Sequence, residues 1–221
     1  MNQMKKLLSS AFLGLGLVSA FGQGQVNFLN GGATFATTAN RYVYETVVGP
    51  GAINPNFPNF LGSADPNRLT GTTFVAGLWY LAGANRGAEI GSAVQAGRLF
   101  NFRASTTAEQ NRGTWVVPIG ASSLFTLDGV NFGSSATLQV RVWDGAKYAS
   151  FEAAVAASGD FGRSESFNFI APVQGELNPN AYLMDNLRAF TVGLAPEPSS
   201  IALGLLGAVS LLLFRRKKSL R

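Results

Sequence analysis

The sequence predicts a mainly β chain in which one β-sandwich domain lies between two apolar terminal segments. Runs rich in β-branched and aromatic residues recur through residues 23–194, and Gly, Asn, Pro and Asp separate them. About 170 residues are enough for one well-buried core. Because the chain has no cysteine, this core must stabilise the domain without disulfides.

Residues 1–22 have the features of a secretory signal peptide: a basic start, an apolar run over residues 7–20 and small residues behind it. Two frames suit the −3 and −1 positions of a signal-peptidase site, Val18 with Ala20 and Ala20 with Gly22. The mature chain is therefore expected to begin at residue 21 or 23, with signal peptidase as a partner. A buried helix of a cytosolic domain is the alternative interpretation.

Seven runs in the central domain are predicted to be strands, over residues 41–48, 72–81, 98–103, 114–119, 137–143, 166–170 and 187–194. The second run is almost continuously apolar, which predicts a central strand buried on both faces. In the fifth run a period of two places Leu138, Val140 and Val142 inward.

One segment departs from this β pattern. Residues 150–158 are rich in alanine, begin with Ser150 and Glu152, and are followed by Gly159, which together predict a short helix. A second helical turn is expected over residues 180–185.

The connections carry their own signals. Asp-Gly pairs at residues 128–129 and 144–145 predict turns, and residues 49–69, with four prolines, predict a long surface loop. Eight or so short strands with this punctuation indicate a single jelly-roll-like β-sandwich with one short helix.

The C-terminal segment, residues 195–221, has three consecutive features. The prolines of Pro196-Glu197-Pro198-Ser199 favour extended backbone and make the motif a stiff stub. An uncharged run over residues 201–214 follows, and as a helix it spans about 21 Å against about 30 Å of hydrocarbon, which is marginal for a membrane span. The basic cluster behind it is expected to stay cytoplasmic while the rest of the chain is exported; it comprises Arg215, Arg216, Lys217 and Lys218.

These three features closely resemble the bacterial PEP-CTERM sorting signal. The resemblance covers residues 195–221 and implies recognition by a membrane-embedded exosortase, a cysteine transpeptidase-like enzyme. It implies a chain that crosses the inner membrane, is anchored transiently, loses its tail and reaches the cell surface or an exopolysaccharide matrix. A permanent single-pass anchor is the alternative.

The central domain carries a second resemblance, in residues 24–28, 74–80 and 138–144. These segments are similar to uncharacterised verrucomicrobial surface proteins that bear the same sorting signal. The resemblance implies no reaction.

The charge distribution excludes a nucleic-acid partner. The formal net charge of +5 arises from the two terminal segments, whereas residues 23–194 hold ten basic and eleven acidic residues, a net charge of −1. Binding to phosphates requires a basic stripe, and the central domain has none.

The absence of histidine and cysteine removes thiol nucleophiles, imidazole triads and Cys/His metal sites. Asp144, Glu152, Asp160 and Glu165 could form a glycosidase-like pair, but turns and a helix N-terminus account for these residues. We therefore expect no catalytic residue, no metal and no cofactor, although a structural Ca²⁺ stays open. A carboxylate-based glycoside hydrolase is one alternative function.

The aromatic residues suggest the other alternative, a lectin-like module. Trp79, Trp115 and Trp143 lie in apolar runs, where core packing is the default role. An exposed aromatic platform on a β-sandwich would instead suit sugar stacking. The expected function is a non-enzymatic structural or adhesive surface module, with polysaccharide as its partner.

Overall fold

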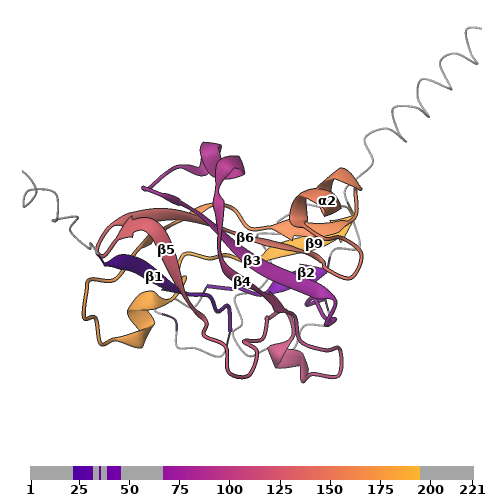
Figure 1. The fold of residues 1–221 in the computed structure, drawn as a ribbon. Helices are drawn as coiled ribbons and strands as arrows, with labels where there is room; N and C mark the ends of the chain where they lie inside the picture. Colours follow the sequence, from indigo (N-terminus) through magenta and orange to yellow (C-terminus); the bar gives the residue numbers. More distant parts are fainter. Residues whose placement is uncertain (1–21, 32–34, 36–38, 46–66, 195–221) are drawn as a thin grey trace, which may run out of the picture.

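The computed structural model describes residues 22–31, 35, 39–45 and 67–194, and these residues form a mainly β structure (Figure 1). The prediction of a mainly β chain is confirmed. Nearly all of the predicted signal peptide (residues 1–21), most of the proline-rich stretch 49–69 and the predicted sorting segment 195–221 lie outside the described residues. Among the described residues, no helix is long and apolar enough to span a bilayer.

The strands form two sheets of unequal size. The larger has seven strands in the order β2-β9-β7-β6-β3-β4, with β8 beside β7 on the same edge of β6. Its only parallel pair is β2 with β9. The strands of this sheet are β2 (Val43–Glu45), β3 (Phe74–Ala82), β4 (Val94–Asn101), β6 (Ser135–Asp144), β7 (Asp160–Arg163), β8 (Phe167–Ile170) and β9 (Phe190–Leu194). The smaller, antiparallel sheet pairs β1 (Gln23–Asn27) with β5 (Leu124–Asn131).

One hydrophobic core joins the two sheets. The inward residues predicted for β6, Leu138, Val140 and Val142, are fully buried, which confirms the period-two interpretation. They belong to the same buried cluster as Val26 of β1 and Leu127 of β5. The small sheet therefore packs against the inner face of the large one.

Six of the seven predicted strands overlap observed ones, but the strand predicted over residues 114–119 is wrong. In that segment only Trp115 forms a bridge, to Phe102. Pro118 has no N–H to donate, and Gly113 and Gly120 on either side have positive φ angles of 75° and 77°. The backbone of this segment therefore cannot extend a regular ladder.

The turn predicted at Asp128-Gly129 is also wrong, because both residues lie inside β5. Leu127 pairs with Gly24, whereas Asn131 pairs with Gln23, so β5 has extra residues opposite a single step of β1. Gly129 has a φ of +77°, which glycine adopts without steric cost, and it makes a β-bulge. The turn predicted after Asp144 is present.

The predicted short helix is α2, Phe151–Ala156, and the Ser150 side chain caps it by accepting a hydrogen bond from the backbone N–H of Ala153. The predicted second helical turn is a 3-10 helix, η3 (Pro179–Tyr182). Two further 3-10 helices, η1 (Gly87–Ser92) and η2 (Glu109–Asn111), follow β3 and β4. In Figure 1, β1 and β5 lie at one end of the molecule, and α2 and β9 lie at the other.

Candidate functional site

A second buried layer lies on the outer face of the large sheet. It consists of Trp79 from β3, Trp143 from β6, and Phe151 and Ala154 from α2. The two indole rings pack edge to face with centroids 6.0 Å apart, and Phe151 contacts both. Because α2 follows β6 after a short turn, the helix folds back over the outward-pointing side chains of its own strand.

Arg141 lies in the middle of this layer, on the outward face of β6. Its guanidinium donates hydrogen bonds to the side chain of Gln139 at 3.0 Å and to the carbonyl oxygen of Ile90 in η1 at 2.8 Å. The guanidinium carbon also lies 4.7 Å from the centroid of a Trp79 ring, a cation–π contact. Arg141 therefore links β6 to both β3 and η1.

The charge of Arg141 is balanced by Glu152 of α2, whose Oε1 lies 3.1 Å from the guanidinium. The Arg141 side chain is 7% exposed and that of Glu152 is 66% exposed, so one partner is desolvated and the other remains in water. Burial lowers the pKa of the Arg141 guanidinium, whereas Glu152 opposes that change. Arg141 was not among the residues predicted from the sequence. The signal that could have identified it is Trp143, because a large apolar side chain two residues along the same face of β6 indicates that this face is covered.

Lys147, the only lysine of residues 23–194, forms a clamp beside this layer. Its ammonium lies 2.9 Å from Oδ2 of Asp160 and 3.2 Å from Oδ2 of Asp144. Hydrogen bonds to Asp160 and Asp144 raise the pKa of Lys147. The clamp joins the end of β6 to the start of β7.

The structure thus places the four carboxylates of the predicted hydrolase alternative in different surroundings. Asp144 and Asp160 come together, and both of their carboxylates pair with the ammonium of Lys147. Glu152 is paired with Arg141, and Glu165 lies exposed in the loop after β7. The geometry suits an ion-pair network that fixes loops.

The three tryptophans are all buried, as core packing requires. Trp79 and Trp143 belong to the outer layer, and Trp115 belongs to the main core. The indole N–H of Trp115 donates to the carbonyl oxygen of Phe28 at 3.0 Å, and that of Trp143 donates to the carbonyl oxygen of Tyr148 at 3.1 Å. In the part of the chain that the structure describes, tryptophan therefore supplies no exposed ring for sugar stacking.

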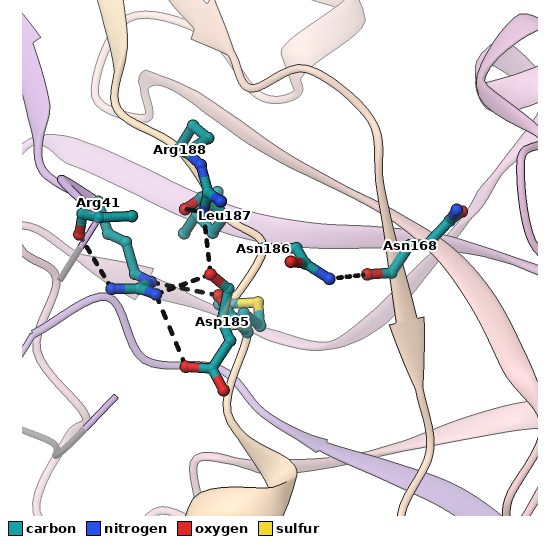
Figure 2. A network of polar contacts seen from close by, with 8 residues as sticks. Arg41, Asn168, Asp185, Asn186, Leu187 and Arg188 are labelled. Carbon is teal, nitrogen blue, oxygen red and sulfur yellow. Dashed lines mark hydrogen bonds and ion pairs between the residues drawn. The ribbon is translucent and has the colours of Figure 1, made fainter. Parts of the chain in front are cut away.

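A second buried cation, Arg41, lies just before β2 and is shown in Figure 2. It donates to the carbonyl oxygens of Asp185 at 2.7 Å and Met184 at 3.4 Å, and its guanidinium lies 3.6 Å from an Asp185 carboxylate oxygen. Arg188 also donates to the carbonyl oxygen of Asp185, at 3.0 Å. Burial lowers the pKa of Arg41, and Asp185 opposes this change. The network holds the loop that leads into β9, the last of the described strands.

Of the residues predicted to take part in export and sorting, the structure describes only Gly22. The other signal-cleavage residues, Val18 and Ala20, lie outside the described residues, as do the motif 196–199 and the basic cluster 215–218. Within the described part of the chain, no group of three or more acidic residues is arranged to hold a metal ion.

Compared with known proteins, the chain matches no family model, no curated protein and no solved structure.

Proposed function

We propose that this chain is an exported bacterial surface or extracellular-matrix protein, which an exosortase recognises through its C-terminal segment and cleaves. The observation that carries the proposal is the ordered set of three features in residues 195–221: a Pro-Glu-Pro motif, an uncharged helix-length run and a basic cluster. The signal-peptide features of residues 1–22 supply the export step.

The described strands lie between these two segments. The first strand, β1, begins at Gln23, and the last strand, β9, ends at Leu194, with one residue between it and Pro196. β9 is paired on both sides, with β2 and with β7. Cleavage within the motif would therefore leave every described strand intact.

For the domain itself we propose a jelly-roll-like β-sandwich that acts as a structural or adhesive module, with matrix polysaccharide as its partner. The support is the packing: the large aromatic side chains and the three buried arginines, Arg41, Arg68 and Arg141, are used to stabilise the fold. The carboxylates Asp144, Asp160 and Glu152 are engaged in ion pairs. Such a domain is built to persist outside the cell without disulfides.

Replacing Glu197 with alanine tests the sorting step. We expect most of the Glu197→Ala protein to stay in the inner-membrane fraction with its tail attached, because the enzyme loses the charged residue of its motif. Fractionation of cells followed by immunoblotting measures this distribution. The matched control is Glu165→Ala, which removes an exposed glutamate of the domain and should be released like the wild type. Normal release of the Glu197→Ala protein would contradict processing at this motif.

A further inference from the structure

Asn30, in the segment that follows β1, is a buried hydrogen-bonding centre of the fold. Only 2% of the residue is exposed. Its side-chain nitrogen Nδ2 donates to the carbonyl oxygens of Gly113 at 2.9 Å and Arg41 at 3.1 Å, and its Oδ1 accepts from the backbone N–H of Trp115 at 3.3 Å. One amide therefore connects segments that lie up to 85 residues apart in the chain.

The next residue, Gly31, has to lack a side chain. A Cβ at this position would lie 2.6 Å from Cγ2 of Thr114, closer than such carbons approach in proteins. The Thr114 side chain is held in place, because its hydroxyl donates to the carbonyl oxygen of Asn111 at 2.7 Å and accepts from the guanidinium of Arg103 at 2.9 Å. The contacts of the fold therefore favour both residues of the Asn30-Gly31 pair.

The pair is also the one Asn-Gly sequence of the chain, and Asn-Gly is chemically unstable when its backbone is free to move. Because glycine has no side chain to hinder the approach, the backbone nitrogen of Gly31 can attack Cγ of Asn30. The Gly31 nitrogen loses its proton, the side-chain Nδ2 leaves as ammonia, and a cyclic succinimide forms. Water then opens the ring and leaves aspartate or isoaspartate at position 30.

The hydrogen bonds of the fold oppose this reaction. The nitrogen that would leave is the one that donates to Gly113 and Arg41, so the amide must first give up both bonds in a place with almost no access to water. We propose that Asn30 is a self-modification site that reacts only when the domain opens, and that its product prevents the domain from closing again. Irreversible chemistry in the opened state then limits the lifetime of the protein.

The product cannot replace the amide in the folded domain. A carboxylate has no N–H, so it would place a charged oxygen opposite the carbonyl oxygens of Arg41 and Gly113, and burying a charge in this way is costly. The Gly113 carbonyl keeps its bond from the Val43 N–H at 3.0 Å, so most of the cost comes from the buried charge. A protonated acid offers a single O–H, which can serve only one of the two carbonyls.

The test incubates the purified full-length protein in a mildly alkaline buffer, once folded and once in urea above its unfolding midpoint. Peptide mass mapping then locates each asparagine that has become an acid. In urea we expect Asn30 to be modified before any other asparagine, whereas in the folded sample it should stay unmodified over the same time. After removal of the urea, the fraction of molecules that fails to refold should match the fraction modified at Asn30.

The variant Asn30→Asp carries the product from the start. We expect its Tm to be lower than that of the wild type by about 5 °C or more, because the folded domain must accommodate the buried acid. The matched control is Asn131→Asp, the same amide-to-acid change on an exposed residue of β5, which should keep its Tm within about 2 °C of the wild-type value.

Each part of the inference has a result that would overturn it. Modification of Asn30 at equal rates in both samples, or no modification in urea, would contradict a site that the fold controls. Complete refolding of modified molecules, or an Asn30→Asp protein with the wild-type Tm, would contradict the effect of the product. None of these results depends on export or sorting, so the inference and the proposed function can fail separately.

Discussion

Replacing Phe28 with alanine is expected to lower the free energy of unfolding by about 3–5 kcal/mol, the range for a large aromatic residue removed from a core. Phe28 is fully buried immediately after β1. Its ring stacks on Trp115 with centroids 4.6 Å apart and lies 5.5 Å from Phe100 and 5.4 Å from Phe125. The side chain therefore fills the space between the small sheet and β4. Its removal leaves a cavity, because the three neighbouring rings are held by other contacts in the core and cannot all move in to fill it.

Urea unfolding followed by tryptophan fluorescence measures this change. Ile119→Ala is the matched control, because Ile119 is a large apolar residue that is fully exposed, and it should change the free energy of unfolding by less than about 0.5 kcal/mol. A loss below about 1 kcal/mol in Phe28→Ala would show that the two sheets do not share the core described here.

Replacing Arg141 with alanine is expected to lower the free energy of unfolding by about 2–4 kcal/mol. The variant loses the hydrogen bonds that Arg141 donates to the side-chain oxygen of Gln139 and to the Ile90 carbonyl, which keeps its bond from the Ala93 N–H. A buried acceptor that loses its donor, here Oε1 of Gln139, costs about 1–3 kcal/mol. The variant also loses the aliphatic stem and the guanidinium that pack between Trp79 and Phe151. The same unfolding assay measures the effect.

The substitution Glu152→Gln distinguishes the contribution of the Arg141–Glu152 ion pair to stability from the contribution of side-chain packing in the outer layer. Because the Glu152 side chain is 66% exposed, solvent screens its attraction to Arg141, and we expect the substitution to cost less than about 1 kcal/mol. If Glu152→Gln proved as costly as Arg141→Ala, the stability of the outer layer would depend on the ion pair, contrary to the packing described here.

The sequence predicted the inner side of the large sheet better than its outer side. Alternation in β6 identified Leu138, Val140 and Val142 because a period of two distinguishes one face of a strand from the other. It could not show that α2 covers the opposite face, since the position of a helix over a sheet depends on the turn between them. Arg141 and Trp143 lie on that opposite face, and both are buried.

The errors along the chain have local physical causes. An Asp-Gly pair, such as the one at residues 128–129, is found both in turns and in β-bulges. Only the pairing of β5 with β1 decides between the two structures here. The grouping of Asp144 and Asp160 was suggested by their closeness in the sequence, but the ammonium of Lys147 between them depends on how β7 lies beside β6. The register between β6 and β7 cannot be predicted from the order of residues in the sequence alone.

The intact mass of the protein recovered from the extracellular polysaccharide matrix of cells that produce it tests export and sorting most directly. We predict a species smaller than the 23.3 kDa chain that contains residues 23–194 and lacks both the residues before Phe21 and the basic cluster at the C-terminus. Recovery of the complete 23.3 kDa chain from the cytosolic fraction, with none in the matrix, would contradict the proposed function.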